Sequence, residues 1–145
     1  MIKGFFERLL GAGDSTASDA DARLALTALL VRVARADFSY DAVEQAQIDK
    51  VISRRYALSS AETEALRHEA EALEADAPDT VRFTRAIKDA VPYDERIAVV
   101  QSLWSVVLAD ATRDEHEDAL LRMVANLLGV SDRDSNLARQ RASGA

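Results

Sequence analysis

The sequence predicts an all-α protein, and three features of the chain support this prediction. Apolar residues recur at helical spacing almost throughout the 145 residues, without the alternating segments between turn signals that indicate strands. Between residues 14 and 143 the only glycine is Gly129, and the only prolines are Pro78 and Pro92. The third feature is an internal repeat. Together they predict a compact single-domain bundle of about seven to eight helices, built from two similar three-helix repeats.

The internal repeat has an offset of 73 residues over most of its length. It pairs acidic with acidic residues and apolar with apolar residues: Asp37 with Asp110, Asp41 with Asp114, Glu44 with Glu117, Leu30 with Leu103, and Val33 with Val106. This register is too long for chance helical periodicity, and two copies are too few for a repeat array. We therefore infer a duplication, with repeats over about residues 20–75 and 93–142.

Helix start and stop signals define the expected elements. We expect an amphipathic helix within residues 1–10, a flexible linker of small and polar residues over 11–18, and a helical domain over 19–142. The first helix of the domain is expected over about residues 20–36, and one later helix is expected to have Pro78 near its first turn. The other helices are expected to begin at Asp41, Ser59, Asp94, Asp114 and Ser131.

Two helices are apolar on nearly all sides, those at residues 20–36 and 95–109. Such helices must be buried, and their equivalent places in the two repeats predict that they form a central pair. The helices that follow each of them carry one apolar stripe: Val43, Ile48, Val51, Ile52 and Tyr56 in the first repeat, and Leu120, Met123, Val124, Leu127 and Leu128 in the second. Trp104 is expected in the core rather than at a ligand.

Composition narrows the classes of function. A formal net charge of −7 argues against a nucleic-acid-binding protein, which usually carries a basic face. The chain has no cysteine and only two histidines, so a thiolate metal site is excluded and a zinc site is disfavoured. No apolar run approaches the length of a membrane span, and Glu7 and Arg8 interrupt what would be the apolar part of a signal peptide. We therefore expect a cytoplasmic protein.

Each repeat contains an acidic corner, where an apolar helix ends and the next helix begins. Two interpretations remain open for its carboxylates. They can cap and order the helix start, since Asp41-x-x-Glu44 and Asp114-x-x-Glu117 both have the spacing of a capping box. Alternatively they can bind calcium or another divalent cation weakly, because such cations prefer oxygen ligands. The candidate ligands are Asp37, Asp41, Glu44, Asp110, Asp114 and Glu117.

Residues 24–137 resemble the TerB family, which is known from tellurite-resistance operons. The resemblance is carried by the stretches LLVRVARADFSYDAVEQAQIDKVI, RFTRAI and LWSVVLADATRDEHEDALLRMVANLLGVSD. Family members typically show Ala-Asp-Gly, followed shortly by an acidic residue and Glu, twice per chain. Here Phe38 and Ala111 replace the two glycines. The resemblance implies a compact helical fold of two similar halves and a link to metal-ion stress responses.

No nucleophile–base pairing or phosphate-binding loop is discernible, so no catalytic residue is assigned and we expect a non-enzymatic protein. Our first hypothesis is a TerB-like module that contacts a protein partner and is tuned by divalent cations at the acidic corners. The alternative is a peripheral membrane or co-chaperone-type adaptor at the inner face of the membrane. It would use the amphipathic helix at residues 2–10.

Overall fold

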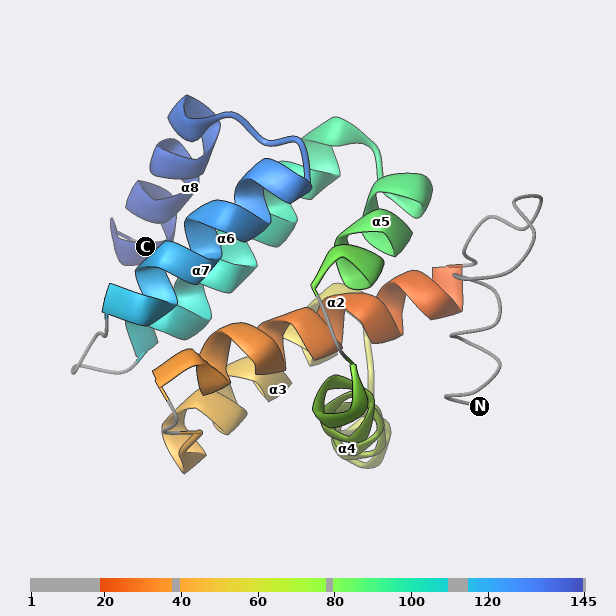
Figure 1. Ribbon diagram of the computed structural model, residues 1–145. Helices are drawn as coiled ribbons and strands as arrows, with labels where there is room; N and C mark the ends of the chain where they lie inside the picture. The colour runs from red at the N-terminus through yellow and green to blue at the C-terminus, as the bar shows by residue number, and fades with distance from the viewer. Residues whose placement is uncertain (1–18, 38–39, 78–79, 110–114, 145) are drawn as a thin grey trace.

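The computed structural model confirms the all-α prediction: its described residues form seven α-helices and one 3₁₀-helix, with no strand (Figure 1). It describes residues 19–37, 40–77, 80–109 and 115–144, with the backbone alone for residues 19, 37, 115–118 and 144. The predicted helix at residues 2–10 and linker at 11–18 lie outside these ranges. The elements are α2 (Asp19–Ala34), η1 (Arg35–Asp37), α3 (Ala42–Tyr56), α4 (Ser60–Asp76), α5 (Val81–Ala90), α6 (Tyr93–Ala109), α7 (Glu115–Leu127) and α8 (Asp132–Gly144).

Helices α2 and α6 contact each other and supply most of the core, as their composition predicts. Every apolar side chain of α2 from Leu24 to Ala34 is at most 7% exposed. In α6, Leu103 and Val106 are fully buried, and Trp104 is 2% exposed. The Trp104 indole N–H donates to the Ser135 hydroxyl at 3.2 Å, which offsets the cost of burying that donor.

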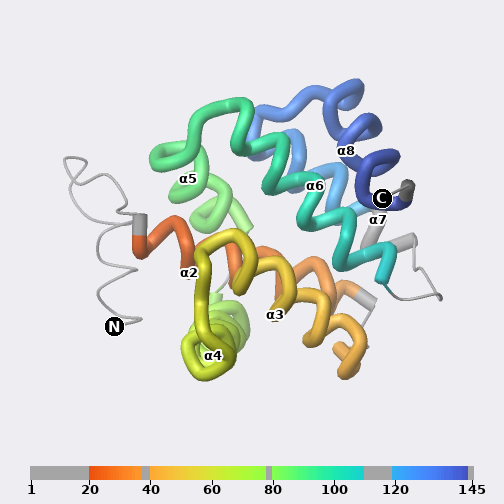
Figure 2. The backbone as a smooth tube through the Cα atoms, turned by 180° about the vertical axis from the view of Figure 1, so that it is seen from behind, coloured from red at the N-terminus to blue at the C-terminus, as the bar shows by residue number. Residues whose placement is uncertain are grey.

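The two repeats interlock rather than lying side by side as separate units. Within each repeat the first helix packs extensively on the third, α2 on α4 and α6 on α8. Each second helix, however, also packs on the first helix of the other repeat: α3 on α6, and α7 on α2 and η1. Helix α5 joins the repeats and covers α2, and the two views in Figures 1 and 2 show the same arrangement.

Several predicted helix starts are confirmed by their capping hydrogen bonds. The Ser59 hydroxyl accepts from the Glu62 amide at 3.2 Å, and the Glu62 carboxylate accepts from the Ser59 amide at 2.9 Å, which completes a capping box. The Ser131 hydroxyl accepts from the Asp134 amide at 3.1 Å. Asp41 is the N-cap of α3. The start predicted at Asp114 lies outside the described residues.

Two predicted starts lie within three residues of the observed ones. Helix α5 begins at Val81 after the cap residue Thr80, three residues beyond Pro78, near which its first turn is expected. Helix α6 begins at Tyr93, directly after Pro92, whose carbonyl accepts from the first-turn amides. Asp94 therefore lies inside the first turn, where the helix dipole still favours its charge.

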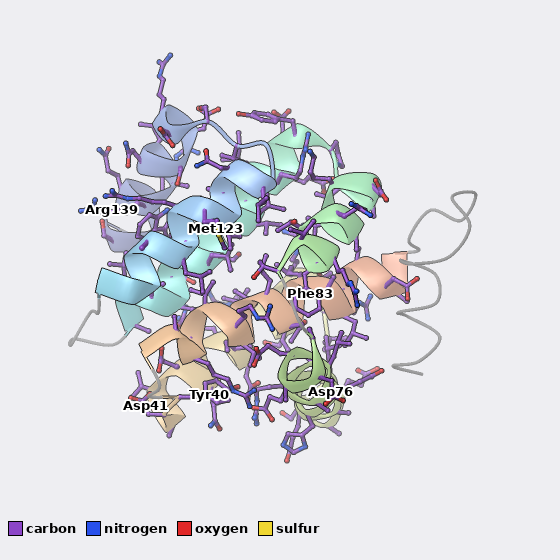
Figure 3. The ribbon with its side chains drawn as sticks, in the orientation of Figure 1. Tyr40, Asp41, Asp76, Phe83, Met123 and Arg139 are labelled. Atoms are coloured by element: carbon purple, nitrogen blue, oxygen red, sulfur yellow. The ribbon has the colours of Figure 1, made fainter. Side chains whose placement is uncertain are left out.

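Eight of the ten residues of the predicted apolar stripes are buried or partly buried, and two are exposed. Val43 in α3 is 53% exposed, and Met123 in α7, labelled in Figure 3, is 45% exposed. Both are therefore corrected from core to surface. The core-facing sides of these helices are set by Ile48 and Ile52 in α3 and by their counterparts in α7, and helical spacing turns the two exceptions away from that side.

The duplication extends to the way that α3 and α7 end. Ala57 (φ 54°) follows α3 and Gly129 (φ 75°) follows α7, both in the left-handed region. In both turns the amide of the next residue bonds back across the turn, Leu58 to the Ser53 carbonyl at 3.0 Å and Val130 to the Ala125 carbonyl at 2.9 Å. This is the Schellman pattern, in which glycine is the favoured left-handed residue.

Replacing Ala57 with glycine should therefore stabilise the protein. A left-handed alanine is strained by its Cβ, and relief of that strain outweighs the added freedom of the unfolded chain. We expect Ala57→Gly to raise the free energy of unfolding by about 0.5–1 kcal/mol, measured by urea denaturation. Gly129→Ala is the matched opposite change and should lower it by a similar amount or more. If both variants raised the free energy of unfolding, or both lowered it, this explanation would be wrong.

The central pair can be tested through equivalent positions in the two repeats. Leu30 and Leu103 are fully buried, so truncation removes core contacts and leaves cavities. We expect Leu30→Ala and Leu103→Ala each to lower the free energy of unfolding by about 2–5 kcal/mol. Val43→Ala, at an exposed site, is the control and should change it by less than about 0.5 kcal/mol. A small effect at either leucine would show that one central helix is not part of the cooperative core.

Candidate functional site

The acidic corners are the candidate site, and the fold brings the helix ends beside them to one end of the bundle. η1, which contains Asp37, contacts α7 of the other repeat. The C-terminal ends of α2 and α6 and the N-terminal ends of α3 and α7 lie together at the left of Figure 1 and the right of Figure 2. The chain segments flanking both corners therefore meet at one place on the molecule.

In the first corner, Asp41 has a structural role. It adopts an extended backbone (φ −96°, ψ 178°), and its carboxylate accepts from the Glu44 amide at 3.0 Å. This bond satisfies one of the free amides at the start of α3, as the capping interpretation predicts. The carboxylate remains partly exposed at the end of the bundle, where Figure 3 labels it beside Tyr40.

Glu44 differs from its prediction. Its carboxylate makes no return bond to the Asp41 amide, and the side chain is fully buried. The capping box is thus half formed at this corner. One helical turn further on, Ile48 is also fully buried, which places Glu44 on the face of α3 that packs against the rest of the bundle.

The other predicted cation ligands cannot be placed by their side chains. Only the backbone of Asp37 is described, within η1, and only the backbone of Glu117, within α7. Asp110 and Asp114 lie outside the described residues. Among the side chains that are described, no group of three or more Asp, Glu, His or Cys residues is close enough to hold a metal ion. The cation site remains a prediction.

An ion-pair network that the sequence did not predict ties this end of α2 to α4. Glu74 binds Arg32 through Oε2 at 3.1 Å and Arg35 through Oε1 at 2.6 Å. The Arg32 guanidinium also donates to the carbonyl oxygens of Glu74 and Ala77, at 3.2 and 2.8 Å, and to the Thr80 hydroxyl at 3.3 Å. Arg35, the basic residue nearest Asp37 in the sequence, is therefore already paired.

A second network attaches the start of α3 to α4. The Tyr40 hydroxyl donates to Glu71 Oε2 at 2.6 Å, and Arg67 bridges Glu71 and Asp49 at 2.9 and 2.7 Å. Burial, followed by the Glu71 carboxylate, raises the pKa of Tyr40 above its ordinary value of 10, so the phenol stays protonated and keeps donating. The Arg35 guanidinium lies 5.0 Å from the centre of the Tyr40 ring and links the two networks.

Most contacts of the two networks have no local sequence signal, because the paired residues are far apart in the chain. Arg32 and Glu74 are 42 residues apart, and Tyr40 and Glu71 are 31 apart. Only the pair of Arg67 with Glu71 has the i, i+4 spacing that a sequence can reveal. The two networks attach the chain on both sides of the first corner to α4.

These features define a class: an all-α bundle of two interlocked three-helix repeats, with the helix ends that flank the two acidic corners at one end. The family model described as "Tellurite resistance protein TerB" matches residues 23–140. The chain belongs to the TerB family, as its motifs indicated. No curated protein and no solved structure matches it. Within the described part of the chain, no helix is both long and apolar enough to cross a membrane.

Glu74 should be the residue on which attachment of α4 depends most. Glu74→Gln keeps the size of the side chain but leaves two arginines without a carboxylate in a mostly buried site. We expect a loss of about 2–3 kcal/mol in the free energy of unfolding, below the cost for a fully buried pair because Arg35 is partly exposed. The measurement is urea denaturation. Glu64→Gln, at an exposed position on the same helix, is the control; an equal loss there would remove the special role of Glu74.

Proposed function

We propose that this TerB-family chain is a non-enzymatic interaction module in a metal-ion or tellurite stress response, and that its acidic end binds a divalent cation weakly. The observation that carries the proposal is the contact between η1 and α7. This contact brings the chain segments that flank both acidic corners to one end of the bundle. Oxygen ligands from both repeats can therefore bind cations in the same region. We place this function in the cytoplasm and expect a protein partner.

The electrostatics of this end favour a cation. The carboxylates of the acidic corners repel one another, and a bound cation would relieve that repulsion. The helix dipoles make no net contribution, because the negative ends of α2 and α6 meet the positive ends of α3 and α7. Arg35 is held by Glu74 and is therefore less able to neutralise Asp37. Calcium accepts oxygen ligands in flexible geometry, which suits loop carboxylates that no cysteine or histidine cluster accompanies.

The described corner residues give no support to a catalytic role. Asp41 is engaged as a helix cap, and Glu44 is buried within the bundle. A catalytic carboxylate needs a partner group and access to a substrate. A cation bound at the corners would instead fix the loops relative to α3 and α7, which changes the surface offered to a partner.

Calcium titration of the full chain, followed by amide NMR, tests this proposal. We expect millimolar calcium to shift amides within residues 36–45 and 109–118 together, because both corners contribute to one region. Magnesium should produce smaller shifts, since it loses its water ligands reluctantly. If calcium moves no amide in either range, the cation part of the proposal is wrong.

Asp41→Asn provides a matched variant for that titration. Asparagine still accepts the Glu44 amide bond, so the helix cap is preserved while one charge is removed. We expect this variant to weaken calcium binding at least about threefold, with the unfolding midpoint nearly unchanged. Asp89→Asn, an exposed acidic position on α5, is the control and should leave the affinity unaltered.

A further inference from the structure

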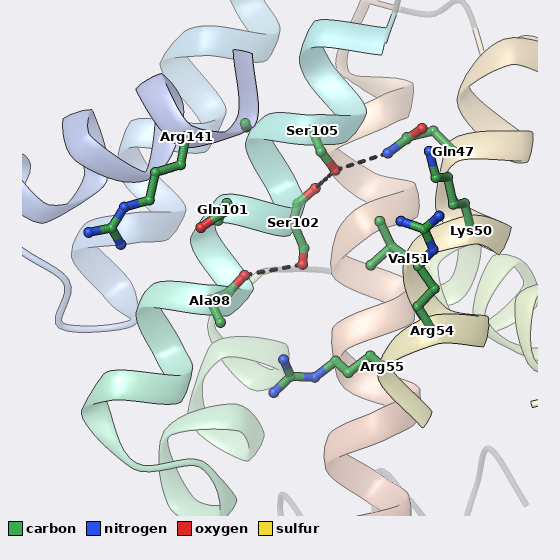
Figure 4. A pocket seen from close by; sticks show the side chains of 11 residues that line it. Gln47, Lys50, Val51, Arg54, Arg55, Ala98, Gln101, Ser102, Ser105 and Arg141 are labelled. Atoms are coloured by element: carbon green, nitrogen blue, oxygen red, sulfur yellow. Dashed lines mark hydrogen bonds between the residues drawn. The ribbon is translucent and has the colours of Figure 1, made fainter. Parts of the chain in front are cut away.

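A groove of about 630 Å³ runs between α3 on one side and α6 with α8 on the other (Figure 4). Lys50, Arg54 and Arg55 line it from α3, and Arg141 lines it from α8. No acidic residue is among the residues that line it. In a chain with a net charge of −7, this is a local concentration of positive charge.

The cations of the groove are available to a ligand. Lys50, Arg54 and Arg141 are exposed, and the described residues offer none of them an ion pair. This contrasts with Arg32, Arg35 and Arg67, which are held by carboxylates elsewhere in the bundle. Arg55 is half-buried with its guanidinium 5.8 Å from the Tyr56 ring centre, and it extends toward α6 in Figure 4.

The hydroxyl groups of the groove donate their hydrogen bonds to the protein backbone. Ser102 donates to the Ala98 carbonyl at 3.1 Å, and Ser105 donates to the Ser102 carbonyl at 2.6 Å. Gln47 donates to the Ser105 hydroxyl at 3.3 Å, as the dashed lines in Figure 4 show. These serines therefore cannot donate to an anion as well, and the groove does not have the converging donors of a phosphate pocket.

The positive charges are instead spread along and across the groove. Lys50 and Arg54 are one turn apart on α3, a rise of about 6 Å, and Arg141 lies on the opposite side. A single small anion cannot contact all of these groups at once. A chain that carries several carboxylates can, and charge complementarity over several points gives such a ligand both attraction and orientation.

We propose that this groove binds an acidic peptide segment of a partner protein, which contacts the cations of α3 and crosses α6 to reach Arg141 on α8. The inference rests on the proposed role as an interaction module and names the chemistry of the partner. It does not depend on the cation site, because the groove is lined by the middle and last turns of α3 and by α6 and α8, away from the acidic junctions. None of the residues that line the groove is aromatic, so a nucleic acid would find no surface there on which its bases could stack.

The test is fluorescence anisotropy of a labelled ten-residue glutamate peptide with the full chain, at low salt and in EDTA. EDTA removes divalent cations, so failure here is separate from failure of the calcium titration. We expect saturable binding at one peptide per chain, weakened at least tenfold by the double variant Arg54→Glu and Arg141→Glu. Absence of saturable binding by the unaltered chain overturns the proposal.

The matched control is the double variant Arg85→Glu and Lys88→Glu. Both residues are exposed cations on α5 outside the groove, and the change in net charge is the same. We expect its affinity to stay within about twofold of the unaltered chain. Equal weakening by both variants would mean attraction to overall charge, and would overturn the groove assignment. Circular dichroism of each variant confirms that it is folded.

Two further ligands identify the class of occupant. A single-stranded oligonucleotide of equal charge and vesicles containing phosphatidylserine should both bind more weakly than the peptide. Tighter binding of either, lost in the groove variant, would replace the acidic peptide with nucleic acid or membrane. Amide NMR with the peptide should shift residues 47–55, 98–105 and 141–142; shifts confined to other regions would contradict the proposal.

Discussion

The structure depends on the burial of two helices, α2 and α6, that are apolar over most of their surface. Helices α2 and α6 can leave water only if other helices surround them, and the arrangement that achieves this interlocks the repeats. Because α3 covers α6 and α7 covers α2, neither repeat can bury its own first helix alone. The same exchange brings the helix ends that flank both acidic corners to one end of the bundle. The place proposed for the candidate site is therefore a consequence of how the core is closed.

Charge is distributed unevenly on this fold, in ways that matter for binding. Arg32 and Arg35 are used to attach α4, and their carboxylate partner is largely buried. The acidic corners and the basic groove lie on different parts of the bundle, so a net charge of −7 conceals a local site of opposite sign. Such a surface repels polyanions at a distance while accepting a short acidic segment at close range. Binding that combines the two regions would respond to both salt and divalent cations.

The sequence by itself determined the helical class, the duplication, the central pair and several helix starts. These properties follow from patterns within one or two helical turns, which any stretch of chain carries locally. The caps at Asp41, Ser59 and Ser131 can be predicted from the sequence, because each side chain accepts a hydrogen bond from the amide only three residues later in the chain. Leu30 and Leu103 are buried because each lies in a helix that is apolar over most of its surface.

Only the tertiary structure decided which polar groups meet. The pairing of Glu74 with Arg32 joins residues 42 apart, and no periodicity specifies it. The exposure of Met123 depends on how α7 is rotated against its neighbours, and the groove exists only because α3 and α8 flank the same side of α6. Local residue spacing determines where a helix begins and which of its sides is apolar. The contacts between helices depend on the packing of the whole chain, and the ion-pair networks and the proposed binding surface arise from those contacts.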